Sequence, residues 1–270
     1  MEPLSVASSV VGVTPPALHC VRHLLDDIQK IIDAPEAVAS LRGDLTATDK
    51  ALISLQTITD SQWKSLGDIV IDESKSAMTL CLSSCERFQT ALARWTQHSH
   101  NGKLSWRDRA VVGFFKQKQI KSMSEQLQIC KTTLTSVVSI ATLHSSLQQK
   151  DVSDDLLNMI SLKEAEVTTA LEAANKQLVE VNTQLAALRV AGQRGGETEA
   201  DRADVDGQVV DELSALDTSR RLLEALLERT HAAVAEAQKE DDGPRFVFGN
   251  VEKGFQIGTN SGTISGITFN

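Results

Sequence analysis

Apolar residues recur at alternating steps of three and four through most of the chain, the spacing that places them on one face of an α-helix. Four such stripes precede residue 150, over residues 17–33, 38–55, 63–95 and 106–148. Pro35 disfavours helical geometry in the residue before it, so the first helix is expected to end near Asp33. Residues 98–103 are expected to form a loop, with Ser105 as the N-cap of the next helix. The pattern predicts a bundle of four or five helices with its own core over residues 1–150.

Two longer stripes follow a seven-residue repeat with apolar first and fourth positions. They cover residues 154–191, where Glu164 breaks the repeat, and residues 209–237, where Arg220 does. A polar, glycine-containing linker is expected between them, over residues 192–207. The two stripes predict a long antiparallel helical hairpin across residues 151–242. A parallel coiled coil between two chains fits the same pattern.

Composition narrows the class of protein to a soluble, all-α fold. Only 4% of residues are aromatic and there is no Tyr, which argues against a β-sandwich or a surface that stacks nucleobases. The net charge of −9 argues against general nucleic-acid binding. The charge gathers in residues 151–242, where 21 acidic residues face 9 basic ones, the mark of a solvated helix surface. The four cysteines form no CxxC pair, and no signal peptide is evident, so a cytoplasmic location is expected.

The sequence gives little support for catalysis. The phosphate-binding, dinucleotide, zinc-protease and serine-hydrolase motifs are all missing. His19 and His23 are one helical turn apart, but no third ligand is evident, so they are interpreted as ordinary surface or core histidines. Cys81 and Cys85 share a helix face and are expected to be core thiols rather than a redox pair. We therefore expect no enzymatic activity, no cofactor and no metal.

The first residues form an uncharged segment that runs from Pro3 to Leu18. A membrane-spanning helix needs about 20 apolar residues, so this segment is too short to span and Pro15 interrupts it. It suits either a first core helix or partial insertion into a membrane. The candidates for membrane insertion are Leu4, Val6, Val10, Val11 and Val13.

The last residues have a different composition, with glycine at every fourth position from Gly254 to Gly266. The segment is nearly palindromic about Gly262, since Phe255 mirrors Phe269 and Ile257 mirrors Ile267. As a strand, it would stack Phe, Thr and Asn side chains over their own copies, as in a steric zipper. A flexible Gly-rich tail is the alternative. The strict spacing and the Phe residues favour an amyloid-forming motif over residues 243–270.

The chain also resembles a known family. The opening MEPLSVASSVVGV, the Ala34-Pro35 break and the Trp106-Arg107 segment are similar to the fungal HeLo-like N-terminal domain, also called the azaphilone-cluster protein L N-terminal domain. The resemblance covers about residues 1–150. It implies a four-helix killer domain like that of the mixed-lineage kinase-like necroptosis effector, whose N-terminal helix attacks membranes.

The tail resembles fungal amyloid signalling motifs of the HET-s-related, pseudo-palindromic or RIP-homotypic type. The residues that carry this resemblance are Phe248, Gly249, Asn250, Val251, Gly254, Phe255, Gln256, Ile257, Gly258, Asn260, Gly262, Ile264, Gly266, Ile267 and Phe269. The resemblance implies a cell-death effector or signalling adaptor. Its partners would be further copies of itself, a STAND-type receptor with a matching motif and, on activation, plasma-membrane lipids. A non-lytic coiled-coil scaffold and an accessory protein of a secondary-metabolite cluster are the alternatives.

Overall fold

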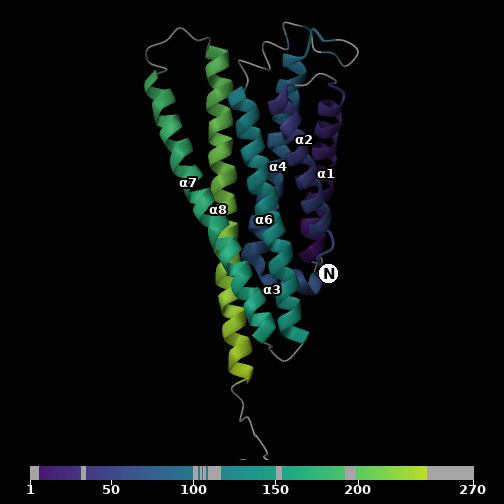
Figure 1. Ribbon diagram of the computed structural model, residues 1–270, viewed down its shortest axis with the longest axis vertical. Coiled ribbons are helices and arrows are strands. Elements are labelled where there is room, and N and C mark those ends of the chain that lie inside the picture. The colour runs from purple at the N-terminus through teal and green to yellow at the C-terminus, as the bar shows by residue number, and fades with distance from the viewer. Residues whose placement is uncertain are drawn as a thin grey trace, which may run out of the picture.

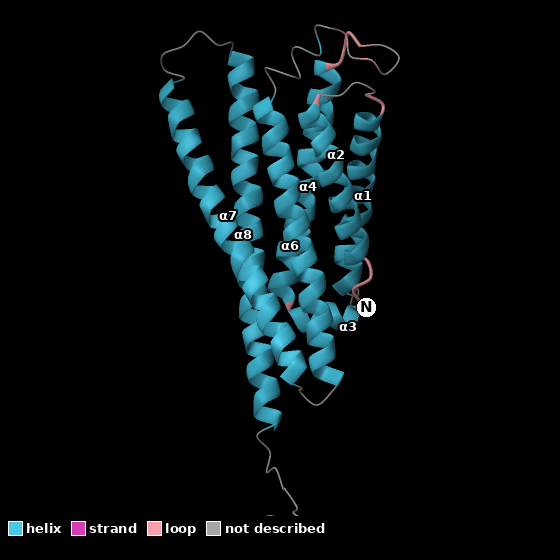
Figure 2. Cartoon of the chain, viewed as in Figure 1, coloured by secondary structure: helices cyan, strands magenta, loops and turns pink. Residues whose placement is uncertain are grey.

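The computed structural model describes residues 6–31, 35–99, 103, 105, 108, 117–149, 154–191 and 199–241. The elements defined within these residues are all α-helices (Figure 2), which confirms the predicted all-α class. They are α1 (Val6–Gln29), α2 (Glu36–Leu55), α3 (Asp60–Leu66), α4 (Asp68–Trp95), α6 (Gln117–Gln149), α7 (Asp154–Ala191) and α8 (Glu199–Asp241).

The long helices lie roughly along one axis and form an elongated bundle (Figure 1). Helix α6 packs against α2, α3, α7 and α8, and α4 packs against α1, α6 and α8. Helices α1 and α7 lie at opposite edges of the bundle. Helices α7 and α8 lie side by side and run in opposite directions.

One hydrophobic core runs through the bundle. All six residues of the second predicted stripe, from Val38 to Leu55, are buried on α2. The last two helices contribute to the same core through Leu156 and Ile160 of α7 and Leu222 and Leu226 of α8. The division of the chain at residue 150 stays a prediction.

The first helix differs from the prediction at both ends. Helix α1 begins at Val6, continues through Pro15 and Pro16, and ends at Gln29 rather than near Asp33. Each proline removes one backbone donor and leaves the carbonyl four residues earlier without its helical partner. Both prolines and Gly12 are exposed, so the carbonyl of Gly12 can bond to water instead.

The third predicted stripe is two helices rather than one. Helix α3 begins with a capping box, in which Thr59 and Gln62 each satisfy a backbone donor of the other. It ends at Leu66, and the next residue, Gly67, has a φ of 87°, in a region that favours glycine. Helix α4 begins at the next residue, so Gly67 turns the chain between the two helices.

The long helices also change one predicted boundary. On α7, burial recurs every seven residues at Ile160, Val167, Ala174 and Val181, as the heptad predicts. The predicted linker over residues 192–207 is too long, because α8 begins at Glu199. Residues 199–206 are mainly Glu, Ala, Asp and Arg, and none of these breaks a helix.

Candidate functional site

The N-terminal half of α1, residues 6–16, contains most of the predicted membrane-insertion residues. Val10 is buried and Val13 is half-buried against the core. Val6 and Val11 lie within α1, but their side chains are outside the description, and Leu4 lies outside the described residues. The tail motif from Phe248 to Phe269 also lies outside the described residues.

The N-terminal half of α1 rests on the bundle mainly through apolar burial. Among its residues with described burial, only Val10 and Thr14 are buried. The Thr14 hydroxyl lies 2.9 Å from the carbonyl oxygen of Val10 and 3.3 Å from the sulfur of Met78 on α4. Because residues 3–18 carry no charge, this half of α1 has no side chain that could form an ion pair.

The C-terminal half of α1, residues 17–29, has polar connections in addition to its apolar face. Arg22 Nε lies 2.6 Å from Asp49 Oδ1 on α2. Gln89 Nε2 on α4 donates to Asp27 Oδ2 at 2.7 Å. Partial burial would raise the pKa of Asp27, but hydrogen bonds from Gln89 and Lys30 lower it below its usual range. These contacts join the C-terminal half of α1 to α2 and to α4.

The two halves of α1 are therefore held differently, and the two prolines lie at the boundary between them. Full burial of one Val is worth about 1.5–3 kcal/mol. Of the side chains with described burial in the N-terminal half, Val10 and Thr14 are buried, and the two prolines remove two backbone hydrogen bonds at its end.

The two histidines of α1 lie at the surface. Their ring centroids are 6.1 Å apart, and His23 Nδ1 lies 3.3 Å from Asp27 Oδ2. Within the described residues, no group of three or more His, Cys, Asp or Glu side chains could hold a metal ion.

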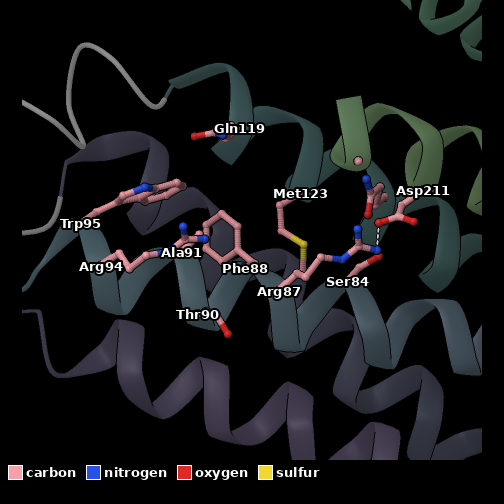
Figure 3. A pocket seen from close by; sticks show the side chains of 12 residues that line it. Ser84, Arg87, Phe88, Thr90, Ala91, Arg94, Trp95, Gln119, Met123 and Asp211 are labelled. Atoms are coloured by element: carbon pink, nitrogen blue, oxygen red, sulfur yellow. Dashed lines mark ion pairs between the residues drawn. The ribbon is translucent and has the colours of Figure 1, made fainter. Parts of the chain in front are cut away.

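A pocket that the sequence does not reveal lies between α4, α6 and α8 (Figure 3). Its volume of about 310 Å³ is at the small end of the range for ligand sites. The rings of Phe88 and Trp95 meet edge to face beside it, with centroids 5.7 Å apart. Arg87 of α4 forms an ion pair with Asp211 of α8. This ion pair joins α8 to the bundle at the rim of the pocket.

No helix within the described residues contains a stretch long and apolar enough to cross a membrane.

Comparison with known proteins places the chain in a family. Neither the curated proteins nor the solved structures gave a match. The family model described as "Pigment biosynthesis cluster protein PigL N-terminal" matches residues 1–228. The match extends through α7 and into α8, beyond the 150 residues over which the resemblance was predicted. The chain thus belongs to the pigment biosynthesis cluster protein PigL N-terminal family, the azaphilone-cluster family that its opening residues predict.

Proposed function

We propose that the chain is a fungal cell-death effector or signalling adaptor that acts without catalysis. In this proposal, the tail assembles into an amyloid-like stack on contact with a matching motif. Assembly brings many bundles together, and the N-terminal half of α1 leaves its place and inserts shallowly into a membrane. The observation that carries the proposal is the difference in contacts between the two halves of α1. The half up to Pro15 and Pro16 is uncharged, whereas the half after them forms polar contacts with α2 and α4.

Clustering supplies the membrane affinity that a single copy of the protein lacks. A segment of eleven residues that includes Val6, Val10, Val11 and Val13 buries too little apolar surface to hold one protein on a membrane. Linked copies bind together, because the first insertion raises the effective concentration of the others at the membrane. The segment is also too short to span the bilayer, so shallow insertion fits its length.

The tail supplies the clustering in this proposal. Its four regularly spaced glycines and mirrored Phe and Ile residues suit in-register stacking of identical chains. Replacing Ile257 with Pro removes one ladder donor from every layer and should abolish seeded growth of thioflavin-positive fibrils. Ile257→Val keeps a β-branched side chain and should still grow, so equal seeding by both variants would contradict the tail motif.

Two other functions have some support. The seven-residue burial repeat of α7 favours a coiled-coil scaffold without membrane activity. The description of the family favours an accessory protein of a pigment biosynthesis cluster. Neither alternative requires the N-terminal half of α1 to move.

Leakage of dye from vesicles tests the proposal with a matched pair of variants. Gly12 on α1 and Gly43 on α2 are both exposed, and a Cβ added at either one meets nothing within 4 Å. Gly12→Asp therefore leaves the folded bundle unchanged but places a charge on the segment that must enter the lipid. Gly43→Asp places the same charge on a helix that stays in the bundle.

With preformed tail fibrils as seeds, we expect leakage from wild type and Gly43→Asp but not from Gly12→Asp. Without seeds, none of the three should release dye. Equal leakage from the two Asp variants, or no leakage from seeded wild type, would contradict the effector function and favour the scaffold.

A further inference from the structure

The pocket between α4, α6 and α8 is lined by one face of each of these helices. Residues three, four or seven positions apart lie on the same face of a helix. The lining follows this spacing in Phe88 and Trp95 of α4, Met123 and Gln126 of α6, and Gly207 and Asp211 of α8. The pocket therefore forms only when α8 packs against α4 and α6.

One end of the pocket is aromatic. Figure 3 shows Trp95 and Phe88 at this end, with Met123 beyond Phe88. Phe88 is buried, whereas Trp95 is only half-buried, so part of the Trp95 ring stays accessible from the pocket. Aromatic rings prefer edge-to-face or offset-stacked contacts, and the two rings already meet edge to face. A flat aromatic ring of a bound molecule can extend this pair.

The other end of the pocket is polar. Figure 3 shows Arg87, Ser84 and Asp211 there. Gln126 also lines the pocket and is only 9% exposed, and its side-chain amide forms no hydrogen bond within the part of the chain that the structure describes. A buried amide without a partner is unfavourable, because it has lost its hydrogen bonds to water. A polar group of a bound molecule would supply the missing hydrogen bond.

The charged side chains of the pocket determine which polar group fits. The charged residues of its described lining are Arg87, Arg94 and Asp211, which together leave one positive charge. Arg87 forms an ion pair with Asp211, but a guanidinium has five donors and can serve a second acceptor as well. One carboxylate would balance the charge of the pocket, and it can accept hydrogen bonds from both Arg87 and Gln126.

We propose that this pocket binds a small molecule that carries a flat aromatic ring and one carboxylate. The ring contacts Trp95 and Phe88, and the carboxylate accepts hydrogen bonds from Arg87 and Gln126. Because the molecule contacts the packed helices and not the unfolded chain, it also stabilises the attachment of α8 to the bundle. The described lining includes no residue of α1, so this inference does not depend on the proposed membrane activity.

Isothermal titration calorimetry of the unseeded full chain tests the proposal, with 2-naphthoate as the probe. We expect one site with a Kd of about 0.1–1 mM, the affinity typical of a ligand of this size. The neutral analogue 2-naphthylmethanol should bind up to about fivefold more weakly, since one partly exposed ion pair is lost. Equal binding of the two probes would overturn the assignment of the carboxylate. Absence of saturable binding in the millimolar range would overturn the site itself.

A matched pair of variants tests where the probe binds. Gly207 lines the pocket and Gly43 on α2 does not, and a Cβ added at either one meets nothing within 4 Å. Leu is a better helix former than Gly, so both Gly207→Leu and Gly43→Leu should stay folded. We expect the affinity for 2-naphthoate to fall by about tenfold in Gly207→Leu, because the added side chain takes up space at the pocket wall, and to stay unchanged in Gly43→Leu. Equal affinities of the two variants would place the binding elsewhere and overturn the proposal.

Asp211→Asn separates charge from shape. It keeps the size of the side chain but removes the negative charge beside Arg87. The affinity for 2-naphthoate should therefore rise by up to about fivefold, whereas the affinity for 2-naphthylmethanol should not change. The circular dichroism melt of the variant shows whether it is folded. A lower affinity for 2-naphthoate in folded Asp211→Asn would contradict the binding of a carboxylate at Arg87.

Discussion

The Thr14 hydroxyl of α1 lies 3.3 Å from the sulfur of Met78 on α4, in the buried interface between the two helices. The same hydroxyl lies 2.9 Å from the carbonyl oxygen of Val10, one turn earlier on α1. The next two residues are Pro15 and Pro16, which cannot donate a backbone hydrogen bond. Thr14, a buried residue of the N-terminal half of α1, therefore lies immediately before the two helix residues that lack a backbone donor.

Replacement of both prolines by alanine tests whether this weak point matters. Pro15→Ala/Pro16→Ala restores two backbone donors, and helix propensity favours Ala over Pro by about 3 kcal/mol per residue. Since α1 already accommodates the prolines, we expect a smaller gain, of about 1–2 kcal/mol, in the free energy of unfolding from urea titration. Seeded vesicle leakage should fall.

Pro35→Ala is the control for the proline substitution, because Pro35 precedes α2 and lies outside α1. It should leave leakage unchanged. Full leakage from a stabilised double variant would contradict release of the N-terminal half of α1.

Much of the fold follows from the sequence, because the apolar stripes report burial directly. The stripe residues between Val38 and Leu55 on α2, and every seventh residue from Ile160 to Val181 on α7, are buried as predicted. The predicted helix boundaries differ from the structure at two prolines and in a charged segment. Pro15 and Pro16 lie within a helix at exposed positions. The charged residues that follow Glu199 belong to α8 rather than to a linker, and none of them breaks a helix.

The candidate site was less predictable than the fold. Uncharged residues at the N-terminus identify a segment, but they do not reveal that Arg22 and Asp27 anchor only the second half of α1. Nor does spacing reveal the pocket between α4, α6 and α8, because Arg87 and Asp211 meet only after these helices have packed. Such sites depend on which faces of distant helices meet, which periodicity alone does not determine.

His144 makes the stability of the bundle sensitive to pH. It is buried on α6, and its Nε2 has no hydrogen-bond partner within the described part of the chain. Burial, with the charge of Arg229 on α8, lowers the pKa of His144 to about 4, while a hydrogen bond to Ser65 and the charge of Glu236 oppose the shift. Arg229 Nε donates to the Ser65 carbonyl oxygen at 2.5 Å.

The unfolded chain binds a proton at this ring near pH 6.5, whereas the folded chain does so only near pH 4. Stability should therefore fall as the pH drops from about 6.5 to 4, by up to about 3 kcal/mol. Urea titrations across this range should show a smaller loss for His144→Leu, since carboxylates contribute the remainder. An identical slope for His144→Leu and wild type would show that His144 is not the titrating group.

The shared core predicts that α8 is needed for the stability of the first helices. Leu222 and Leu226 are fully buried in the same core as α1, α2 and α4. Leu222→Ala should reduce the free energy of unfolding by about 2–5 kcal/mol, whereas Val210→Ala, at an exposed position on α8, should have little effect. A fragment that ends at Lys150 tests the predicted division of the chain, and the absence of a sharp thermal transition would show that α7 and α8 complete the core. Cooperative unfolding of that fragment would show that residues 1–150 are a domain of their own.

Hydrogen exchange of the assembled, vesicle-bound full chain tests most directly whether the N-terminal half of α1 leaves the bundle. Peptides that cover residues 6–16 should change their exchange rate on seeding in the presence of vesicles, while peptides from residues 17–29 and from α2 keep their rates. Gly12→Asp should prevent the change, and Gly43→Asp should not. Unchanged exchange over residues 6–16 in seeded protein that causes leakage would contradict the account, because the membrane activity would then arise elsewhere in the chain.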